Sequence, residues 1–318
     1  MTDVGFALSS ELHGPAELVE QAVRAEAAGF DFVALSDHFH PWIPAQGESP
    51  FAWTVLGGVA AATEAVEVGT GVTAPIQRYH PAILAQATAT AADMLDGRFY
   101  FGVGTGERLN EHVVGDHWPP STVRREMLRE AVQVIRALWR GDEITHHGRH
   151  YTVENAKLFT LPEEPPPVYV SAYGPKAATL AGDIGDGFYT VGPQESALER
   201  YREVGGEGPA YAQMTISYAE TAEEAVRSAH ERWPNVGLPG ELSSELATPV
   251  HFRQASQQVS ESDIAEGSTI TDPDPGTHVE NVESFAEAGF DHVVVHQIGA
   301  DLDGFFDTYE DEVLPAVE

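Results

Sequence analysis

The sequence predicts one (β/α)8 barrel, an α/β fold, over residues 1–318. Three observations predict it: short apolar runs alternate with stretches of helical length, the alternation yields eight strands, and 318 residues suit one barrel with insertions. A hydrophobic fraction of 42% is enough for a large core. We therefore expect a single TIM-barrel domain rather than two separate domains.

The first half of the chain supplies four strand–helix units. Phe30–Leu35 is apolar and is bounded by Gly29 and Pro41, which is typical of a strand covered on both faces. Gly29 also suits the end of the first helix, because glycine favours a left-handed C-cap. The strands are expected at Val4–Leu8, Phe30–Leu35, Val66–Thr73 and Arg98–Gly104. The helices are expected at Pro15–Ala28, Phe51–Glu64, Pro81–Leu95 and Ser121–Trp139.

The second half supplies four more strands and two excursions from the barrel. Its strands are expected at Val168–Ala172, Gly187–Val191, Tyr211–Ala219 and Asp291–Gln297. Helices are expected from Pro175 onward, at Thr221–Arg232 and after the last strand. Residues 147–161 predict a small hairpin. Residues 233–276 hold several proline and glycine breaks, so they predict a partly helical insertion near the barrel mouth rather than a linker.

The charge is strongly negative. The chain has 50 acidic and 17 basic residues, a net charge of −33, and its only lysines are Lys157 and Lys176. Carboxylates spread over helical faces hold water, and concentrated salt screens their repulsion, because the Debye length is about 3 Å at 1 M salt. This predicts a protein from the cytoplasm of a salt-loaded cell; a surface built to meet a basic partner is the alternative. A nucleic-acid partner is excluded, because phosphate binding needs clustered lysines and arginines.

The chain has no cysteine, which excludes disulfides, a thiolate nucleophile and a cysteine metal site. It does not begin with a basic segment followed by an apolar one, as a secretory signal does. No apolar run approaches the roughly 20 residues of a membrane helix. We therefore expect a cytoplasmic protein with no membrane partner.

The second expected strand runs directly into polar and aromatic residues: Asp37, His38, His40 and Trp42. In parallel α/β proteins the chemistry gathers at the carboxyl ends of strands, because a rigid core holds the loops there. His38 is a candidate acid or base, and Trp42 is a candidate pocket wall. For His40 we prefer a hydrogen bond to the backbone over a catalytic role.

The fourth expected strand ends in a glycine-rich segment. Gly102, Gly104 and Gly106 let the backbone pass close to a ligand, and Glu107 follows at once. The spacing does not match the GxGxxG dinucleotide fingerprint. If both strands belong to one barrel, His38 and Glu107 face the same mouth and could act as acid and base. A tight turn with a capping glutamate is the alternative.

Two further strands end in small residues. Residues 69–75 close the third strand with a sequence that would let a flat ligand lie against the backbone. Residues 171–177 close the fifth, where a helix that starts at Pro175 offers free N–H groups, and Lys176, to an anion. A plain helix start is the alternative there. No metal is expected, because later strand ends add only His296 to His38 and His40.

Together these motifs resemble the coenzyme F420 (deazaflavin)-dependent glucose-6-phosphate dehydrogenase family, a branch of the bacterial-luciferase-like barrel superfamily. The resemblance covers nearly the whole chain and is carried by Ser36-Asp37-His38-Phe39, Pro41-Trp42, Arg78-Tyr79, Pro81-Ala82, Gly102–Glu111, Gly182 and Gly185-Asp186-Gly187-Phe188. With the acidic composition, it indicates a haloarchaeal-type member. It implies a luciferase-like TIM barrel, usually a homodimer, in which hydride passes between a carbinol carbon and the deazaflavin of coenzyme F420.

The resemblance also implies site residues. His38, Trp42 and Glu107 would be catalytic: His38 or Glu107 takes the hydroxyl proton, the other protonates the ring, and Trp42 stabilises the reduced, anionic ring. The cofactor would be held by Asp37, Gly71, Val72, Gly106, Asn110, Tyr173, Gly174, Pro175, Lys176 and Ala177, the last five near its phosphate. A non-prolyl cis peptide bond is expected at Gly71–Val72.

One departure from the family concerns the substrate. The family binds a sugar phosphate with lysines and an arginine, one lysine lying soon after the sixth strand. Here residues 190–194 contain no lysine, and residues 233–271 hold one cation, Arg253. A phosphate dianion would bind poorly without cations. We therefore expect a neutral alcohol, ketone or free sugar. An FMN-dependent luciferase-like monooxygenase and a non-catalytic deazaflavin-binding protein are the alternatives.

Overall fold

Eight parallel strands close into one barrel in the computed structural model, which describes residues 2–238 and 240–317. The order around the barrel is β1-β10-β9-β8-β7-β4-β3-β2. The strands are β1 Asp3–Leu8, β2 Phe32–Leu35, β3 Glu67–Thr70, β4 Phe99–Val103, β7 Val168–Ser171, β8 Gly187–Val191, β9 Ala210–Ile216 and β10 His292–Gln297. The (β/α)8 fold predicted from the sequence is confirmed. β1 pairs with both β2 and β10, so the first and last strands lie side by side.

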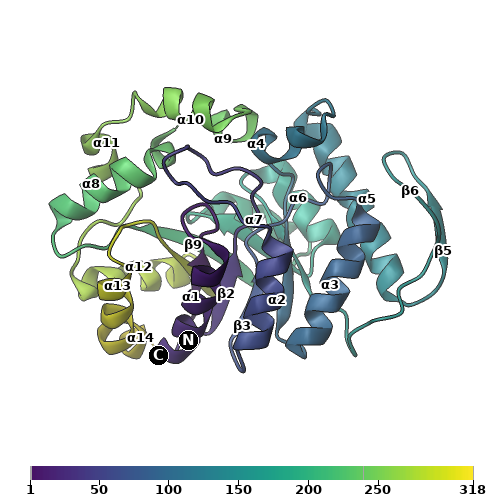
Figure 1. The fold of residues 1–318 in the computed structure, drawn as a ribbon, viewed down its shortest axis with the longest axis horizontal. Helices are drawn as coiled ribbons and strands as arrows, with labels where there is room; N and C mark the ends of the chain where they lie inside the picture. The colour runs from purple at the N-terminus through teal and green to yellow at the C-terminus, as the bar shows by residue number, and fades with distance from the viewer. Residues whose placement is uncertain (1, 239, 318) are drawn as a thin grey trace.

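Helices surround the barrel and connect its strands (Figure 1). The principal ones are α1 Pro15–Ala28, α2 Ala52–Ala62, α3 Pro81–Leu95, α5 Ser121–Trp139, α6 Pro175–Ile184, α7 Glu195–Glu203, α8 Ala222–Arg232, α12 Pro275–Glu287 and α13 Leu302–Thr308, and the chain ends in a π-helical turn Tyr309–Val313 and α14 Leu314–Val317. The bounds of α1, α3 and α5 agree with the sequence prediction. Each has a local signal, such as Gly29 with φ 93° after α1 and Pro81 in the first turn of α3.

Several predicted strands are shorter than expected, among them β9, which ends at Ile216 rather than Ala219, and β2 and β3. β2 begins at Phe32 rather than Phe30, because the N–H of Phe30 bonds to Ala25 O and belongs to the cap of α1. β3 ends at Thr70 rather than Thr73, and the peptide bond Gly71–Val72 that follows it is cis. Thr73 then returns to pair with Val103 as an isolated bridge.

The structure adds elements that the sequence pattern did not predict. α7 was not expected, because its sequence is mostly charged and buries only Ala197, Leu198 and Tyr201. The short helix α4, Arg108–Glu111, directly follows Glu107. The predicted hairpin begins earlier than residue 147: it consists of β5 Ile144–His147 and β6 Thr152–Ala156, which pair antiparallel and project beside α5 (Figure 1).

Residues 233–276 connect α8 to α12 across the carboxyl side of the barrel (Figure 1). They contain a 3-10 turn, Pro234–Gly237, and three short helices, α9 Leu242–Glu245, α10 Pro249–Ser256 and α11 Glu261–Ala265. α9 packs against α4, the helix that follows Glu107. This segment therefore covers the loops that follow β2 and β4.

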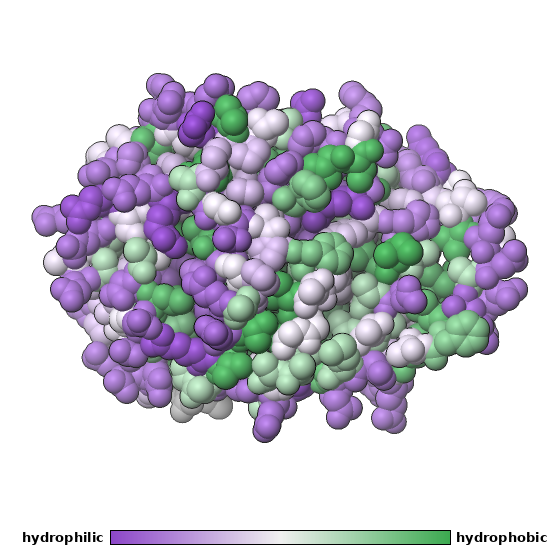
Figure 2. Space-filling view, viewed as in Figure 1, coloured by the Kyte–Doolittle hydropathy of each residue, from purple (hydrophilic) through white to green (hydrophobic). Residues whose placement is uncertain are grey.

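A layer of aromatic side chains fills the barrel interior. The rings of Tyr100, Tyr169 and Tyr211 lie 4.8–5.4 Å apart, and Phe32 and Tyr189 pack with them. This layer holds the strands rigidly, so the loops at their carboxyl ends start from defined positions. Figure 2 shows hydrophilic residues over much of the visible face, as expected from the net charge of −33. Within the described residues, no helix is both long and apolar enough to span a bilayer.

Candidate active site

A cavity of about 840 Å³ opens at the carboxyl ends of the barrel strands. Loops after β1, β2, β3, β4 and β7 line it, together with β8, β9, β10 and residues 233–252. Every residue that the sequence predicts for the site lines this cavity: Asp37, His38, Trp42, Gly71, Val72, Gly106, Glu107, Asn110, Tyr173, Gly174, Pro175, Lys176 and Ala177. The cavity thus brings together segments that are far apart in the sequence.

His38 lies in this cavity with both ring nitrogens engaged. Its Nδ1 is 3.2 Å from the carbonyl oxygen of His40, which can only accept, so Nδ1 donates. Its Nε2 is 3.4 Å from Oε1 of Glu11. A buried carboxylate therefore lies opposite Nε2. The indole of Trp42 packs against the imidazole, with ring centroids 4.9 Å apart.

Glu11 is a buried carboxylate that hydroxyl groups hold in place. Its Oε2 accepts hydrogen bonds from Ser36 Oγ at 2.8 Å and from Ser9 Oγ at 3.2 Å. Burial by itself raises the pKa of Glu11, but the nearby His38 and the Ser36 hydroxyl outweigh it and hold the pKa below its usual value. Glu11 is therefore an anion opposite His38 at neutral pH.

His296 of β10 extends this network. Burial lowers the pKa of His296 to about 4, so the ring is neutral at pH 7. The side-chain amide of Gln213 lies 3.1 Å from Nδ1 and donates to it, so Nε2 carries the proton. That proton points to Ser9 Oγ, 3.1 Å away, and Ser9 in turn donates to Glu11. The donors therefore run in one direction, from Gln213 towards the Glu11 carboxylate.

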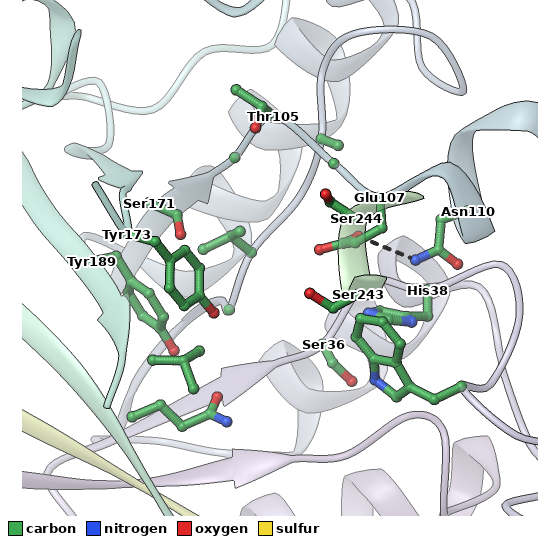
Figure 3. Close-up of a pocket in the computed structure, with 18 of the residues that line it drawn as sticks. Ser36, His38, Thr105, Glu107, Asn110, Ser171, Tyr173, Tyr189, Ser243 and Ser244 are labelled. Atoms are coloured by element: carbon green, nitrogen blue, oxygen red, sulfur yellow. Dashed lines mark hydrogen bonds between the residues drawn. The ribbon is translucent and has the colours of Figure 1, made fainter. Parts of the chain in front are cut away.

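Asn110 joins the loop after β2 to the loop after β4. Its Oδ1 accepts hydrogen bonds from the backbone N–H of Phe39 at 2.9 Å and of His40 at 3.2 Å. Its Nδ2 donates to Glu107 Oε2 at 3.4 Å. Figure 3 shows His38 and Glu107 on the same side of the cavity, with Asn110 behind Glu107. The imidazole and the carboxylate that the sequence predicts as a pair thus face one cavity.

Asp37 is held by protein groups. Its Oδ1 accepts from Arg78 Nη2 at 2.9 Å and from Tyr79 OH at 3.0 Å, and its Oδ2 accepts from Thr73 Oγ1 at 2.7 Å. The guanidinium of Arg78 also lies 3.5 Å from Glu111. Burial raises the pKa of Glu111 to about 7, and Arg78 opposes that rise. Asp37 thus ties the loop after β2 to the loop after β3.

Bare backbone forms part of the cavity wall. The peptide bond Gly71–Val72 is cis, as the sequence resemblance implied. A Cβ at Gly71 would lie 2.8 Å from the Tyr189 hydroxyl and 3.2 Å from Ala34 Cβ. Gly106 has φ 66°, and a Cβ there would lie 2.9 Å from Ala74 Cβ and Glu111 Cγ. Side chains other than glycine do not fit at these two positions, so the backbone there carries no side chain.

The side opposite His38 carries hydroxyl groups and a helix start. Figure 3 shows Ser171, Tyr173 and Tyr189 there. The Tyr189 hydroxyl is buried and has no hydrogen-bond partner among the residues the structure describes. α6 starts at Pro175 with no side-chain cap, and Lys176 in its first turn is exposed. Free N–H groups and a cation at a helix start favour an anionic ligand.

The other candidates of the second strand lie outside this arrangement. His40 Nδ1 donates to Leu109 O at 2.9 Å, and His40 does not line the cavity, so the hydrogen bond to the backbone predicted for it is confirmed. In the described part of the chain, no group of three or more His, Asp or Glu side chains is arranged to hold a metal ion.

Comparison with known proteins decides the family. The model of the family described as luciferase-like monooxygenase matches residues 2–292. The chain belongs to the luciferase-like monooxygenase family. One relative is the F420-dependent glucose-6-phosphate dehydrogenase of Microbacterium testaceum. The two sequences are 36% identical over 98% of this chain and 96% of that enzyme. The corresponding enzyme of Intrasporangium calvum is 36% identical over 100% of this chain and 99% of its own.

A solved luciferase-like structure supports the same placement. An F420-dependent secondary alcohol dehydrogenase, in complex with an F420–acetone adduct, superposes with a TM-score of 0.93. It is 34% identical, and the match covers 100% of this chain and 99% of that one. Relatives acting on a sugar phosphate and on a simple alcohol are therefore similarly close to this chain.

Within the luciferase-like barrel, sequence analysis missed several site residues. Glu11 and Ser9 were not expected, although the polar run after Leu8 follows a strand end and could have indicated them. His296 was noticed only as an isolated histidine. Gln213 gave no signal, because it is one of few polar residues in a mostly apolar strand. Barrel closure between β1 and β10 is what brings these residues to His38.

Proposed function

We propose that this chain is an F420-dependent oxidoreductase that transfers hydride between the carbinol carbon of an alcohol or sugar and the deazaflavin ring. The observation that supports it best is the Asn110 bridge, which holds Glu107 and the His38 loop at one cavity. Curated relatives that cover the whole chain are F420-dependent dehydrogenases, and so is the superposed alcohol dehydrogenase.

The cavity fits such a cofactor. Its volume of about 840 Å³ is within the range of sites that enclose a cofactor-sized ligand. Bare backbone at Gly71 and Gly106 suits a flat ring. The buried Tyr189 hydroxyl has no hydrogen-bond partner among the described residues, so a polar atom of the cofactor can bond to it. The start of α6 with Lys176 suits a phosphate. We assign Gly71, Val72, Gly106 and residues 173–177 to cofactor binding, with Asp37 and Asn110 holding the loops around it.

The protein side chains handle the proton that accompanies the hydride. When bound, coenzyme F420 supplies the hydride acceptor or donor. His38 and Glu107 both line the cavity, and an imidazole and a carboxylate are side chains that can hold or move a proton. The Glu11 carboxylate faces His38 Nε2 at 3.4 Å and stabilises a proton there. Trp42 packs on His38 and restricts water around it.

We propose a neutral alcohol, ketone or free sugar as substrate. Arg124, Arg125 and Lys176 are the lysines and arginines that line the cavity within the described residues, and all three belong to α5 or α6. Arg124 is paired with Glu245 at 3.3 Å. The His38 end instead presents the carboxylate of Glu11. A phosphate dianion beside it would be repelled rather than bound.

The test follows the visible absorbance of oxidised F420 at high salt, with alcohols and sugars that include glucose 6-phosphate. We expect bleaching with a neutral donor, and a fall in kcat of about 10²–10⁴ for His38→Ala. Binding of F420, measured by its fluorescence, should be nearly unchanged in that variant. Bleaching that is equally fast in His38→Ala contradicts the proposed role of the imidazole.

Two other functions give different outcomes in the same experiment. An FMN monooxygenase, the function in the name of the matching family, would copurify with flavin colour and consume oxygen. A non-catalytic binding protein would bind F420, and no donor would cause bleaching. The buried network around His38 favours the dehydrogenase, because neither alternative needs a glutamate paired with a histidine.

We also propose that this enzyme works as a homodimer in the cytoplasm of a salt-loaded cell. The support is the net charge of −33 and the scarcity of lysine, which suit a haloarchaeal-type protein. Sedimentation equilibrium in concentrated KCl measures the oligomeric state, and a monomer at micromolar concentration contradicts the dimer.

A further inference from the structure

The part of the cavity next to His38 has a polar wall formed by strands β1, β9 and β10. Gln213 and Thr215 of β9 and His296 of β10 line it, with Ser9 and Glu11 from the end of β1. Polar contacts of 3.1–3.4 Å connect this wall to His38: His296 to Ser9, Ser9 to Glu11, and the Glu11 carboxylate to His38 Nε2. The polar wall therefore begins at the candidate acid–base residue.

Several hydrogen-bonding groups in and beside this polar wall have no close partner among the described residues. The amide nitrogen of Gln213 donates to His296, but its oxygen has no partner among the described residues. The same holds for the hydroxyl of Thr215. Asn235 lies outside this wall, in the 3-10 turn Pro234–Gly237, and its Oδ1 is contacted only by Gln46 at 3.5 Å. All three residues line the cavity. A ligand with several hydroxyl groups could pair with them.

Aromatic and apolar side chains adjoin this wall. Trp42 and Trp233 line the cavity there, together with Val236, Leu238 and Phe252 of the 233–252 segment, although Glu241, Ser243 and Ser244 of the same segment also line the cavity. Trp233 meets the edge of His296 with ring centroids 4.8 Å apart, and Trp42 packs on His38. The indoles therefore adjoin the polar wall directly. A sugar ring has apolar C–H faces and a rim of hydroxyls, which suits a site where indoles adjoin hydrogen-bonding groups.

We infer that the substrate is a neutral, polyhydroxylated molecule, an unphosphorylated sugar or alditol, whose hydroxyls bind Gln213, Thr215 and Asn235. This rests on the proposed function. A simple alcohol would leave these groups desolvated and unpaired, which sites built for hydroxyls discriminate against strongly. A sugar phosphate would bring its dianion near Glu11, with no lysine or arginine on the β1, β9 or β10 side of the cavity in the described residues.

The experiment compares D-glucose, other aldoses, D-sorbitol, 2-propanol and glucose 6-phosphate. Two readouts are used: kcat/KM with F420, and direct binding to the protein without cofactor by saturation-transfer NMR. The variants are Gln213→Leu and Thr215→Val. Thr190→Val is the matched control, because its hydroxyl is equally deprived of a partner but lies on β8 outside the cavity lining.

We expect kcat/KM for the best neutral sugar or alditol to exceed that for 2-propanol and for glucose 6-phosphate at least about 100-fold. Gln213→Leu and Thr215→Val should each lower the ratio of kcat/KM for this sugar or alditol to kcat/KM for 2-propanol about tenfold or more. Thr190→Val should leave this ratio unchanged. The comparison of aldoses with D-sorbitol decides whether the substrate binds as a ring or as an open chain.

Several results would overturn the inference. They are a preference for 2-propanol or glucose 6-phosphate, a preference ratio that the two variants do not change, or NMR binding no stronger for sugars than for 2-propanol. Absence of F420 turnover with every donor would instead reject the proposed function, while sugar binding by NMR would still report on the polar wall.

Discussion

Glu67 at the amino end of β3 should make the stability of the barrel depend on pH. Its carboxylate lies in the barrel interior, where Tyr211 OH donates to Oε2 at 3.4 Å. Burial raises the pKa of Glu67 from 4.5 to about 7, the Tyr211 hydrogen bond opposes the rise, and the nearby Asp3 adds to it. Between these pH values the folded protein holds a proton that the unfolded chain has released.

The size of the effect follows from the two pKa values. The difference of about 2.5 pH units corresponds to about 3 kcal/mol, at about 1.4 kcal/mol per unit. For a carboxyl with a raised pKa, the stabilising contribution is complete below pH 4.5 and is lost as the pH rises through about 7. Glu67→Gln keeps the shape and an acceptor for Tyr211 but cannot ionise. It should therefore stabilise the protein by under about 1 kcal/mol at pH 5 and by about 3 kcal/mol at pH 8.

The assay is urea denaturation at pH 5 and pH 8 in constant salt, comparing each variant with wild type at the same pH. Glu64→Gln is the matched control, because it makes the same change at an exposed glutamate three positions away. The control should change the free energy of unfolding by less than about 0.5 kcal/mol at either pH. An equal gain for Glu67→Gln at both pH values, or a loss at pH 8, would refute the reasoning.

Three other outcomes are expected. Asn110→Ala removes the bridge between Glu107 and the loop of residues 38–40, so kcat should fall about tenfold in steady-state assays while the urea midpoint changes little; an unchanged kcat would contradict the bridge. Gly106→Ala places a Cβ at φ 66° and should lower the free energy of unfolding by about 1–3 kcal/mol, whereas Gly14→Ala, with open space around it, should cost less than about 0.5 kcal/mol. Raising KCl from about 0.1 M to about 2 M should raise the unfolding temperature, because it screens the net charge of −33; calorimetry showing a decrease would argue against adaptation to salt.

Local signals account for what the sequence predicted well. α1, α3 and α5 have the predicted bounds, because proline, glycine or a long apolar periodicity marks each of them. α7 was missed because a short, charged helix shows little periodicity, and β3 was predicted too long because residues 71–73 continue its apolar pattern but lie outside the strand. Both errors concern features that long-range packing stabilises.

The candidate site also contains residues that local sequence predicts and residues that only the fold brings together. His38, Trp42 and Glu107 could be predicted, because each follows a strand end whose loop has an unusual composition. Glu11 and Ser9 follow the first strand and His296 ends the last, so nothing in their local sequence connects them. They meet only because β1 pairs with β10 on one side and β2 on the other.

The amino-acid sequence by itself determined the alternation of strands and helices, the acidic surface and the identity of the strand-end residues. These depend on composition and on patterns a few residues long. The tertiary structure alone decided which strand ends share a wall, that Asn110 joins two loops, and that the polar groups beside His38 adjoin two indoles. The reason is physical: hydrogen bonds and ring contacts need distances of a few ångströms, and only closure of the barrel brings residues nearly 290 positions apart that close.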